Sequence, residues 1–470
     1  MKAARIATDF SVTAERVRVL FAIAAIVAAA VVATIIQGGF PVSDNAMFEY
    51  IGRAVLHGHV LYRDVWDTKL PPVYYVNAFW QWSFGENYRL HAVAEACIGL
   101  ASIGLFALIG RSFGLRYIAP ASVVLAIMLL LVSDLNSVEM YALPLLLAAV
   151  LASRYGKPLL CGIFIVAATT FWIPAVALTI PAAILLGKKH IPAFISAVVA
   201  GIVILLALML VFAGSSQFLN LLRSWPAYVS SLPAPPQQHH HFPILNRIDR
   251  AYTAFSNFCY GMIDSGAAVL LAILVAAIRK PSDLAQRFGI VWCACMLLAT
   301  CGGTRFYSQY FVPLLPALLF TTCAFLVDLK LTRVSVVMLV LAAIFVVPTF
   351  RDTSRYWIAV SQRSSLSERI GSALRPVMKQ QLSMESDTYK PDLYLSVEPR
   401  LRSQYEIVAP SNSFAENRLS MAPPPDITVI TTGESDSTPR DRGIPICTRI
   451  ASPWRIFASR SVSARFASCD

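Results

Sequence analysis

The residues best suited to chemistry lie close together in an otherwise apolar chain, in the stretch YRDVWDTKLPPVYY. Asp64, Asp67 and Lys69 precede two prolines in this stretch, and a further carboxylate, Asp44, stands upstream of it. A carboxylate at a membrane surface can serve as a general base. An ammonium group next to the headgroup plane is well placed to bind a lipid phosphate. These residue types therefore offer proton transfer and anion binding.

Each of these residues also has a structural interpretation, and the sequence leaves the alternatives open. Asp44 is a favoured N-cap residue that would satisfy the first amides of a helix. Asp64 and Asp67 can be solvated loop charges that pair with Arg63 or Lys69. Alternatively, at least one of the two has a direct role in function. Lys69 either binds phosphate or extends its ammonium group from an apolar surface towards water.

Two further stretches place polar side chains at the ends of apolar segments. LNSVEMYALP contains Glu139, an ionisable residue near membrane depth, which is either functional or a water-exposed interfacial carboxylate. CGGTRFYSQYF contains Arg305 and Tyr310, and Arg305 is a candidate for holding a phosphate together with Lys69. The run His239 to His241 is interpreted as part of an irregular Pro-rich loop rather than as a metal site.

The composition indicates which elements must position these residues. Of the 470 residues, 57% are hydrophobic and 14% are charged, and the mean hydropathy is +0.61. A soluble domain is usually about 45–50% apolar and about 25% charged. The apolar residues come in long blocks, which predicts a polytopic membrane protein. The formal charge of +12 comes from short cationic clusters between the blocks, which is typical of cytoplasmic loops and argues against nucleic-acid binding.

The apolar blocks predict about eleven membrane-spanning helices. The first is uncleaved and leaves the N-terminus in the cytoplasm. One long block is divided at Trp172 into two short helices, because every predicted cytoplasmic loop then carries Lys or Arg. The predicted spans are Val19–Gln37, Leu90–Gly110, Tyr117–Val132, Val138–Ala152, Pro158–Phe171, Trp172–Gly187, Ile191–Ala213, Met262–Ile278, Phe288–Thr300, Tyr310–Val327 and Val334–Pro348.

The domain organisation follows from these spans. Residues 1–350 form the transmembrane domain, in which residues 38–87 are the first external loop and residues 214–261 are a long external loop. Residues 351–470 form a polar external tail, which is either a small α/β domain or partly disordered.

The first external loop contains two candidate interfacial helices. Residues 45–56 have an amphipathic pattern, with Glu49 and Arg53 four residues apart on the polar face, which predicts a helix in the membrane interface. Residues 73–82 are aromatic, as interfacial belts are, and follow prolines that end any preceding helix.

This loop resembles that of the GT-C glycosyltransferases, in particular the group of protein O-mannosyltransferases, aminoarabinose transferases and rhizobial galacturonosyltransferases. Those enzymes share a cytoplasmic N-terminus, one span and a large external loop with two interfacial helices, an acidic residue at its start and a Lys-Pro-Pro-like stretch near its end. The stretch SDNAMFEYIGRAVLHGHVLYRDVWDTKLPPVYYVNAFW reproduces that order. Asn45 and Leu70 depart from the Asp-Glu and Lys-Pro-Pro patterns of many relatives.

The resemblance implies an all-α, GT-C-like bundle and an inverting transfer of a hexosyl or pentosyl group from a polyprenyl-phosphate-linked donor. The acceptor would be an envelope glycan, lipid or protein on the periplasmic side of the inner membrane, where the tail also lies. Asp44 takes the place of the catalytic carboxylate and Lys69 that of the phosphate-binding lysine. The remaining substrate-binding candidates are Asp64, Asp67, Glu139, Arg305 and Tyr310.

The resemblance implies no particular cofactor and leaves a divalent metal open. The alternative function is a secondary transporter or flippase for a lipid-linked or envelope precursor. The clustering of charged groups at one predicted membrane face favours an enzyme, because transporters often carry polar residues in broken helices at the midplane.

Overall fold

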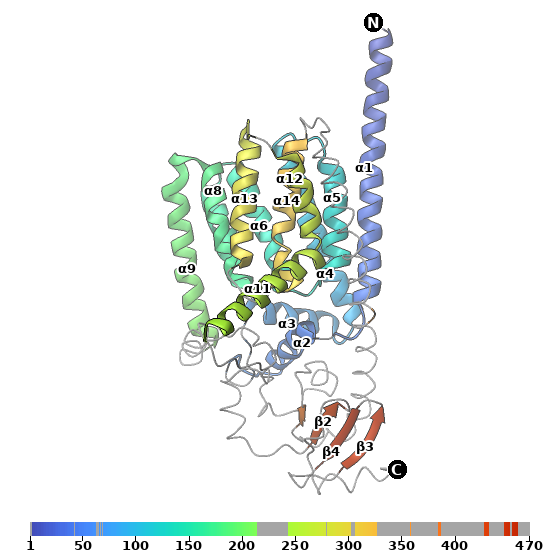
Figure 1. Ribbon diagram of the computed structural model, residues 1–470, viewed down its shortest axis with the longest axis vertical. Coiled ribbons are helices and arrows are strands. Elements are labelled where there is room, and N and C mark those ends of the chain that lie inside the picture. The colour runs from blue at the N-terminus through green and yellow to red at the C-terminus, as the bar shows by residue number, and fades with distance from the viewer. Residues whose placement is uncertain are drawn as a thin grey trace. The chain divides into compact units, whose positions relative to one another are not determined.

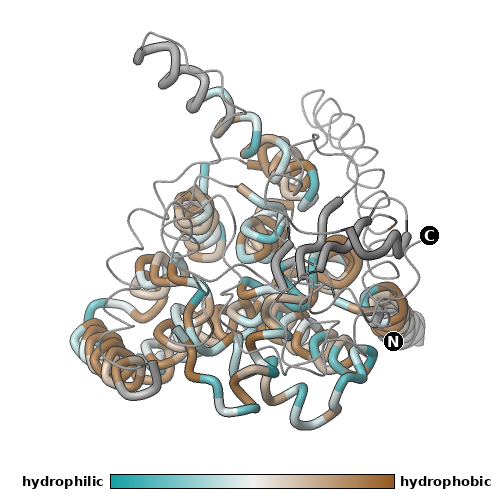
Figure 2. The backbone as a smooth tube through the Cα atoms, turned by 90° about the horizontal axis from the view of Figure 1, so that it is seen from below, coloured by the Kyte–Doolittle hydropathy of each residue, from teal (hydrophilic) through white to brown (hydrophobic). Residues whose placement is uncertain are grey.

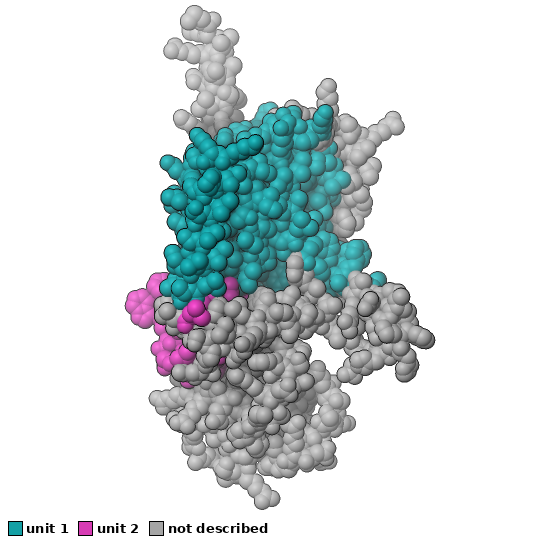
Figure 3. All heavy atoms as spheres, turned by 90° about the vertical axis from the view of Figure 1, so that its left-hand side faces the viewer, with its two compact units in different colours: residues 1–38, 89–208, 229–357 teal, residues 39–88, 209–228, 358–470 magenta. Residues whose placement is uncertain are grey.

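The computed structural model describes the helical core of the chain and a small sheet near its C-terminal end. The chain divides into two compact units, which are described separately (Figure 3). Unit 1 comprises residues 1–38, 89–208 and 229–357, and unit 2 comprises residues 39–88, 209–228 and 358–470. The expected domain boundary at residue 350 stays a prediction. The described residues are 2–41, 43–62, 65, 67, 69–213, 243–278, 280–301, 306–326, 358, 384–386, 427–431, 446–451 and 454–458.

Unit 1 is a bundle of apolar helices, most of which run roughly parallel to one another (Figures 1 and 2). Hydrophobic residues dominate in these helices, which are seen nearly end-on in Figure 2. The helices are α1 (Lys2–Gln37), α4 (Tyr88–Ser112), α5 (Ile118–Ala126), α6 (Val138–Arg154), α7 (Pro158–Phe171), α8 (Thr179–Leu186), α9 (Ile191–Ala213), α11 (Pro243–Asp264), α12 (Ala267–Ala277), α13 (Leu284–Cys301) and α14 (Leu314–Leu326). Shorter segments are η1 (Ile127–Val132), η2 (Ile173–Leu178), η3 (Lys188–His190) and η4 (Ser308–Phe311).

The helices confirm a multi-pass membrane protein. Among the described residues, five helices are long and apolar enough to cross a bilayer, or six if a bent pair counts as one span, and three shorter apolar helices accompany them. The count of about eleven spans stays a prediction, because the expected span Val334–Pro348 lies outside the described residues.

The structure has a helix break that the sequence predicts, at Trp172, and another that it does not predict, at Gly266. The predicted division at Trp172 is confirmed, because α7 ends at Phe171 and Trp172 adopts an extended backbone before η2. The predicted loop 214–261 is wrong over its last part, which belongs to the amphipathic helix α11. The predicted span Met262–Ile278 starts within the last residues of α11 and is not one straight helix. The helices α11 and α12 meet at 87° across Gly266, whose φ of 72° favours glycine.

Hydrogen bonds between helix ends show which ends lie together in unit 1. The Gln37 side chain, at the end of α1, donates to the Ser133 carbonyl, which follows η1, at 3.1 Å. The Tyr141 hydroxyl of α6 lies 3.2 Å from Glu95 Oε1, near the start of α4. Arg154, at the end of α6, donates to Ser112 O, at the end of α4. The chain direction therefore alternates through these helices, as the spans predict.

One end of the bundle is named the loop end here, because residues 39–88 leave and rejoin unit 1 there. It contains Gln37 and Ser133, and a Cβ atom on Gly38 would lie only 3.1 Å from Arg89 Cγ. The two segments that flank the first loop are therefore adjacent. Gly38 and Arg89, the unit 1 residues that flank the loop, therefore lie at the same end of the bundle, as expected for a loop that follows one span and precedes the next.

An aromatic cluster fixes the opposite end of the bundle. Phe113 of the α4–α5 turn stacks on Phe288 of α13 with ring centroids 5.7 Å apart, and it meets Phe320 of α14 edge-on at 5.1 Å. Trp292 extends the cluster along α13, 5.4 Å from Phe288. Such ring pairs add about 0.5–1.5 kcal/mol each beyond the area they bury. The cluster ties α13 and α14 to the helices nearer the N-terminus.

Unit 2 contains the two predicted helices of the first loop and a four-stranded sheet. The helices are α2 (Ser43–Leu56) and α3 (Pro72–Phe84). The strands β1 (Met384–Ser386), β2 (Ile427–Thr431), β3 (Ile446–Ala451) and β4 (Trp454–Ala458) lie in the order β1-β2-β4-β3. β1 and β2 are parallel, and the other pairs are antiparallel. The strand expected in DITVITT is confirmed as β2, and the strand expected in DLYLSV lies outside the described residues.

The helices α2 and α3 pack directly against each other. A Cβ atom on Gly52 would lie 2.7 Å from the backbone nitrogen of Ala78 and 2.9 Å from the carbonyl carbon of Asn77. Only glycine permits so close an approach of two helix backbones. Met47 and Ile51 of α2 are fully buried, as is Tyr74 of α3. The first loop thus has an apolar core of its own.

Candidate functional site

Asp44 lies in the first turn of α2, seven residues after Gln37, the last residue of α1. Because α2 begins at Ser43, Asp44 stands inside the helix rather than at the N-cap position before it. Its side chain is half-buried. A carboxylate in the first turn stabilises a helix through the helix dipole. This structural contribution and a role as general base are compatible, because the outer face of a half-buried carboxylate remains open to a ligand. Its catalytic role stays a prediction.

Lys69 stands three residues before α3, and its backbone is held by neighbouring side chains. The Tyr62 hydroxyl donates to the Lys69 carbonyl oxygen at 2.6 Å. The Tyr74 hydroxyl donates to Asp67 Oδ2 at 2.7 Å, so the carboxylate two residues before Lys69 is also held. Pro71 and Pro72 then begin α3, where a fixed φ suits the first helical turn. The Lys69 side chain itself is half-buried.

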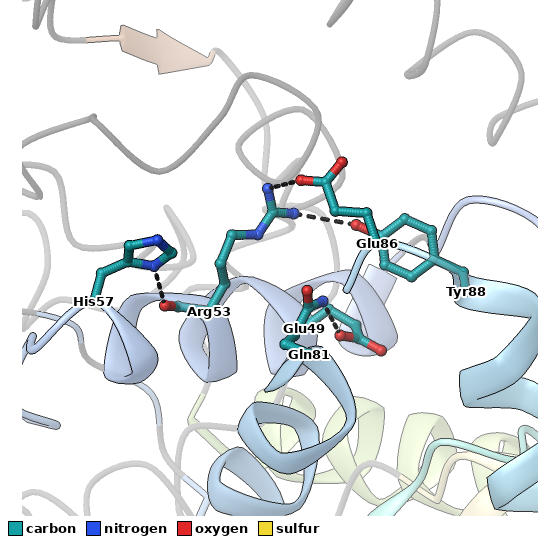
Figure 4. Close-up of polar contacts among 6 residues, drawn as sticks. All are labelled: Glu49, Arg53, His57, Gln81, Glu86 and Tyr88. Carbon is teal, nitrogen blue, oxygen red and sulfur yellow. Dashed lines mark hydrogen bonds and ion pairs between the residues drawn. The ribbon is translucent and has the colours of Figure 1, made fainter. Parts of the chain in front are cut away.

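A second polar network joins α2 to the far end of the loop (Figure 4). Arg53 Nη1 donates to Glu86 Oε1 at 2.8 Å, and Arg53 Nη2 donates to the Tyr88 hydroxyl at 3.1 Å. Gln81 of α3 donates to the carboxylate of Glu49. Glu49 is 2% exposed and Arg53 is 5% exposed. The expectation that these two residues lie on an outward polar face is therefore wrong, because α3 and the residues that follow it, Glu86 and Tyr88, contact that face.

Burial raises the pKa values of three tyrosines in the first loop. It raises the pKa of Tyr50 to about 12, although Arg53 opposes this effect. Burial raises the pKa of Tyr62 and of Tyr74 well above the usual value, and the nearby Asp67 carboxylate raises both further. These hydroxyls therefore keep their protons and remain hydrogen-bond donors throughout the physiological pH range.

In unit 1, Glu139 lies in a buried polar cluster near the loop end. Glu139 is 1% exposed in the first turn of α6, where Ser137 Oγ caps the helix by accepting from Met140 N. The interpretation of Glu139 as a water-exposed carboxylate is therefore wrong. The Tyr141 hydroxyl lies 3.0 Å from Asn136 Oδ1 and 3.2 Å from Glu95 Oε1.

Sequence reasoning missed Glu95 and His91, which are 5% and 2% exposed. They are four residues apart, so they share one face of α4 within a predicted span. An ionisable residue inside a span is the signal that could have found them.

Tyr310 lies in η4, between α13 and α14. Its carbonyl accepts from Thr300 Oγ1, near the end of α13, at 3.2 Å, and its ring meets Tyr307 edge-on at 5.6 Å. Because α13 starts at the aromatic cluster, its last turn and Tyr310 lie towards the loop end. Arg305, Asp64 and the histidine run lie outside the described residues. Within the described part of the chain, no group of three or more metal-ligating side chains is found.

The helices and the first loop together define the class of protein. It is a multi-pass helical membrane protein with a folded, polar first loop between its first two long helices. The crystal structure of ArnT from Cupriavidus metallidurans bound to undecaprenyl phosphate has the same fold, with a TM-score of 0.54 over 94% of this chain and 98% of that chain. The two sequences are 15% identical. The expected GT-C-like fold is thus confirmed. No family model matches the chain, and no curated protein gives a significant match.

Proposed function

We propose that the protein is an integral membrane glycosyltransferase that moves a sugar from a polyprenyl-phosphate-linked donor to an acceptor on the external face of the membrane. The observation that carries this proposal is the ArnT fold, which extends over nearly the whole of both chains. The ArnT crystal structure contains undecaprenyl phosphate, a lipid of the proposed donor class. The half-buried Asp44 and Lys69 in the loop supply the two functional groups that such a transfer requires.

In the proposed reaction Asp44 accepts the proton of the acceptor hydroxyl group. The hydroxyl oxygen then attacks the anomeric carbon of the donor, and the bond between that carbon and the phosphate oxygen breaks. The phosphate keeps the electron pair of that bond, and Lys69, with Arg305, stabilises its added charge. A single displacement inverts the configuration at the anomeric carbon. The donor phosphate therefore needs cations at the membrane surface, where Lys69 is proposed to lie.

The remaining candidates are proposed to bind the substrates. Glu139 and Tyr310, towards the loop end of unit 1, suit hydrogen bonds with sugar hydroxyl groups, and Asp64 is proposed to act beside Lys69. The acceptor is proposed to be an envelope glycan, lipid or protein in the periplasm. The N-terminus is proposed to lie in the cytoplasm and the tail outside, in accordance with the cationic loops of the sequence.

The test is an Asp44→Asn variant in cells that lack the wild-type chain. We expect the variant to enter the membrane normally, to lose sugar transfer and to accumulate the polyprenyl-phosphate sugar, which mass spectrometry of extracted lipids detects. Asp283→Asn is the matched control. Asp283 is exposed and caps α13 by accepting from Gln286 N, and Asn caps equally well. Normal transfer by Asp44→Asn would show that Asp44 is not the base.

A further inference from the structure

The structure points to a role for the two buried tyrosines beside Lys69. We propose that Tyr62 and Tyr74, together with Asp67, are positioning residues that fix the backbone of Lys69 so that its ammonium group is held ready for the donor phosphate. This inference rests on the proposed function, because it assigns how the cation of that site is held. It also changes the interpretation of Asp67, from a residue that contacts substrate to one that acts through Lys69.

The first observation is the hydrogen bonding of the segment that ends at Lys69. Tyr62 is 3% exposed, and its hydroxyl donates to the Lys69 carbonyl at 2.6 Å. Tyr74 is fully buried, and its hydroxyl donates to Asp67 at 2.7 Å. The two bonds hold the chain at Lys69 and two residues earlier. Tyr74 belongs to α3, so the chain at Asp67 is tied to a helix that packs against α2.

The second observation is the backbone of Tyr62, which has a φ of 63°. This left-handed conformation is uncommon for a residue other than glycine and is unfavourable unless the surroundings impose it. Here the Tyr62 amide donates to the Val65 carbonyl at 2.6 Å, and Leu61 and Val65 are each 2% exposed. Tyr62 thus has an unfavourable backbone conformation in a buried turn, and its hydroxyl bonds to the Lys69 carbonyl.

The third observation is a difference between neighbouring tyrosines. Tyr74 and Tyr75 are adjacent in α3, but Tyr75 is 39% exposed whereas Tyr74 is fully buried. The buried hydroxyl groups of Tyr62 and Tyr74 need partners inside the protein, and these partners are the Lys69 carbonyl and the Asp67 carboxylate. A buried hydroxyl that donates to a carboxylate forms a charge-assisted bond, which is shorter and stronger than a neutral one. Tyr75→Phe is therefore the matched control for Tyr74→Phe.

The experiment uses the full chain in nanodiscs, with undecaprenyl phosphate as the probe. Tyr62→Phe, Tyr74→Phe and Asp67→Asn should each weaken binding by about five- to tenfold, the effect of one lost hydrogen bond, while Tyr75→Phe binds as the wild type does. Lys69→Ala should weaken binding further. Combining Tyr62→Phe with Lys69→Ala should then have no additional effect, because a positioning residue acts only through Lys69.

The second readout is the rate at which an amine-reactive ester labels Lys69, measured by peptide mass spectrometry against the exposed Lys189. Tyr62→Phe and Tyr74→Phe should raise this rate ratio about threefold or more by releasing the half-buried Lys69. Unchanged labelling in both variants would overturn the inference, and so would additive losses of binding in the Lys69→Ala background. If the wild type does not bind the probe, the proposed function fails, and the labelling rates alone decide the positioning role.

Discussion

Replacing Gly52 with Ala tests whether the first loop is a folded unit that depends on the close approach of α2 and α3. The added methyl group would lie 2.7 Å from Ala78 N and 2.9 Å from Asn77 C, both backbone atoms of α3. Backbone atoms cannot move aside as a side chain can, so the two helices must separate by several tenths of an ångström. Overpacking of this kind costs about 1–3 kcal/mol, and we expect about 2 kcal/mol here.

The assay is hydrogen–deuterium exchange of the full chain in nanodiscs, followed in peptides that cover α3. A loss of about 2 kcal/mol in the free energy of local opening accelerates amide exchange by about thirtyfold. The change should be confined to α2 and α3, because the loop has its own apolar core. Sugar transfer should also decline, because Lys69 lies only three residues before α3.

Gly104→Ala is the matched control for Gly52→Ala. Gly104 lies in α4, and an added Cβ atom would meet nothing within 4 Å. Alanine at an open helical position is neutral or favourable by about 0.5–1 kcal/mol. Exchange in α3 should then match the wild type. If Gly52→Ala also leaves the exchange of α3 unchanged, the two helices do not pack through their backbones.

Two further predictions concern the same loop. Arg53→Lys should accelerate exchange around Glu86 and Tyr88 by about threefold, because an ammonium group cannot donate to both of them as a fork does. The effect is small because the Glu86 side chain is 49% exposed. Unaltered exchange would show that the fork does not hold the loop. Thermal stability should fall as pH rises from 10 to 12, because unfolded Tyr50 loses its proton near pH 10 and folded Tyr50 at about 12. Tyr50→Phe should make this fall shallower, and an unchanged slope would contradict the assignment.

The sequence predicted the elements that depend on local pattern. α7 has the predicted bounds, since Pro158 suits the first turn of a helix and the chain is extended at Trp172, just before Pro174. The position of Asp44 near the start of a helix was predictable for the same reason. Here the signal lies within a few neighbouring residues.

The sequence could not predict the features that depend on a partner element. Glu49 and Arg53 have the pattern of a surface pair on an isolated helix, and only α3 and the residues after it show that this face is covered. The same holds for Tyr74, because nothing in its immediate sequence shows that its hydroxyl meets Asp67. In α11, the apolar periodicity was present in the sequence, but the preceding Pro-rich segment led to the prediction of a loop.

The most direct test of the proposed function is the mass of the envelope glycans and lipids in cells without the chain, compared with cells that express the wild type or Asp44→Asn. The proposal predicts that the wild type adds a mass equal to one sugar to a single class of envelope molecule. It predicts that the deletion and Asp44→Asn cells both lack this mass. Identical envelope molecules in all three strains would contradict the assignment as a glycosyltransferase.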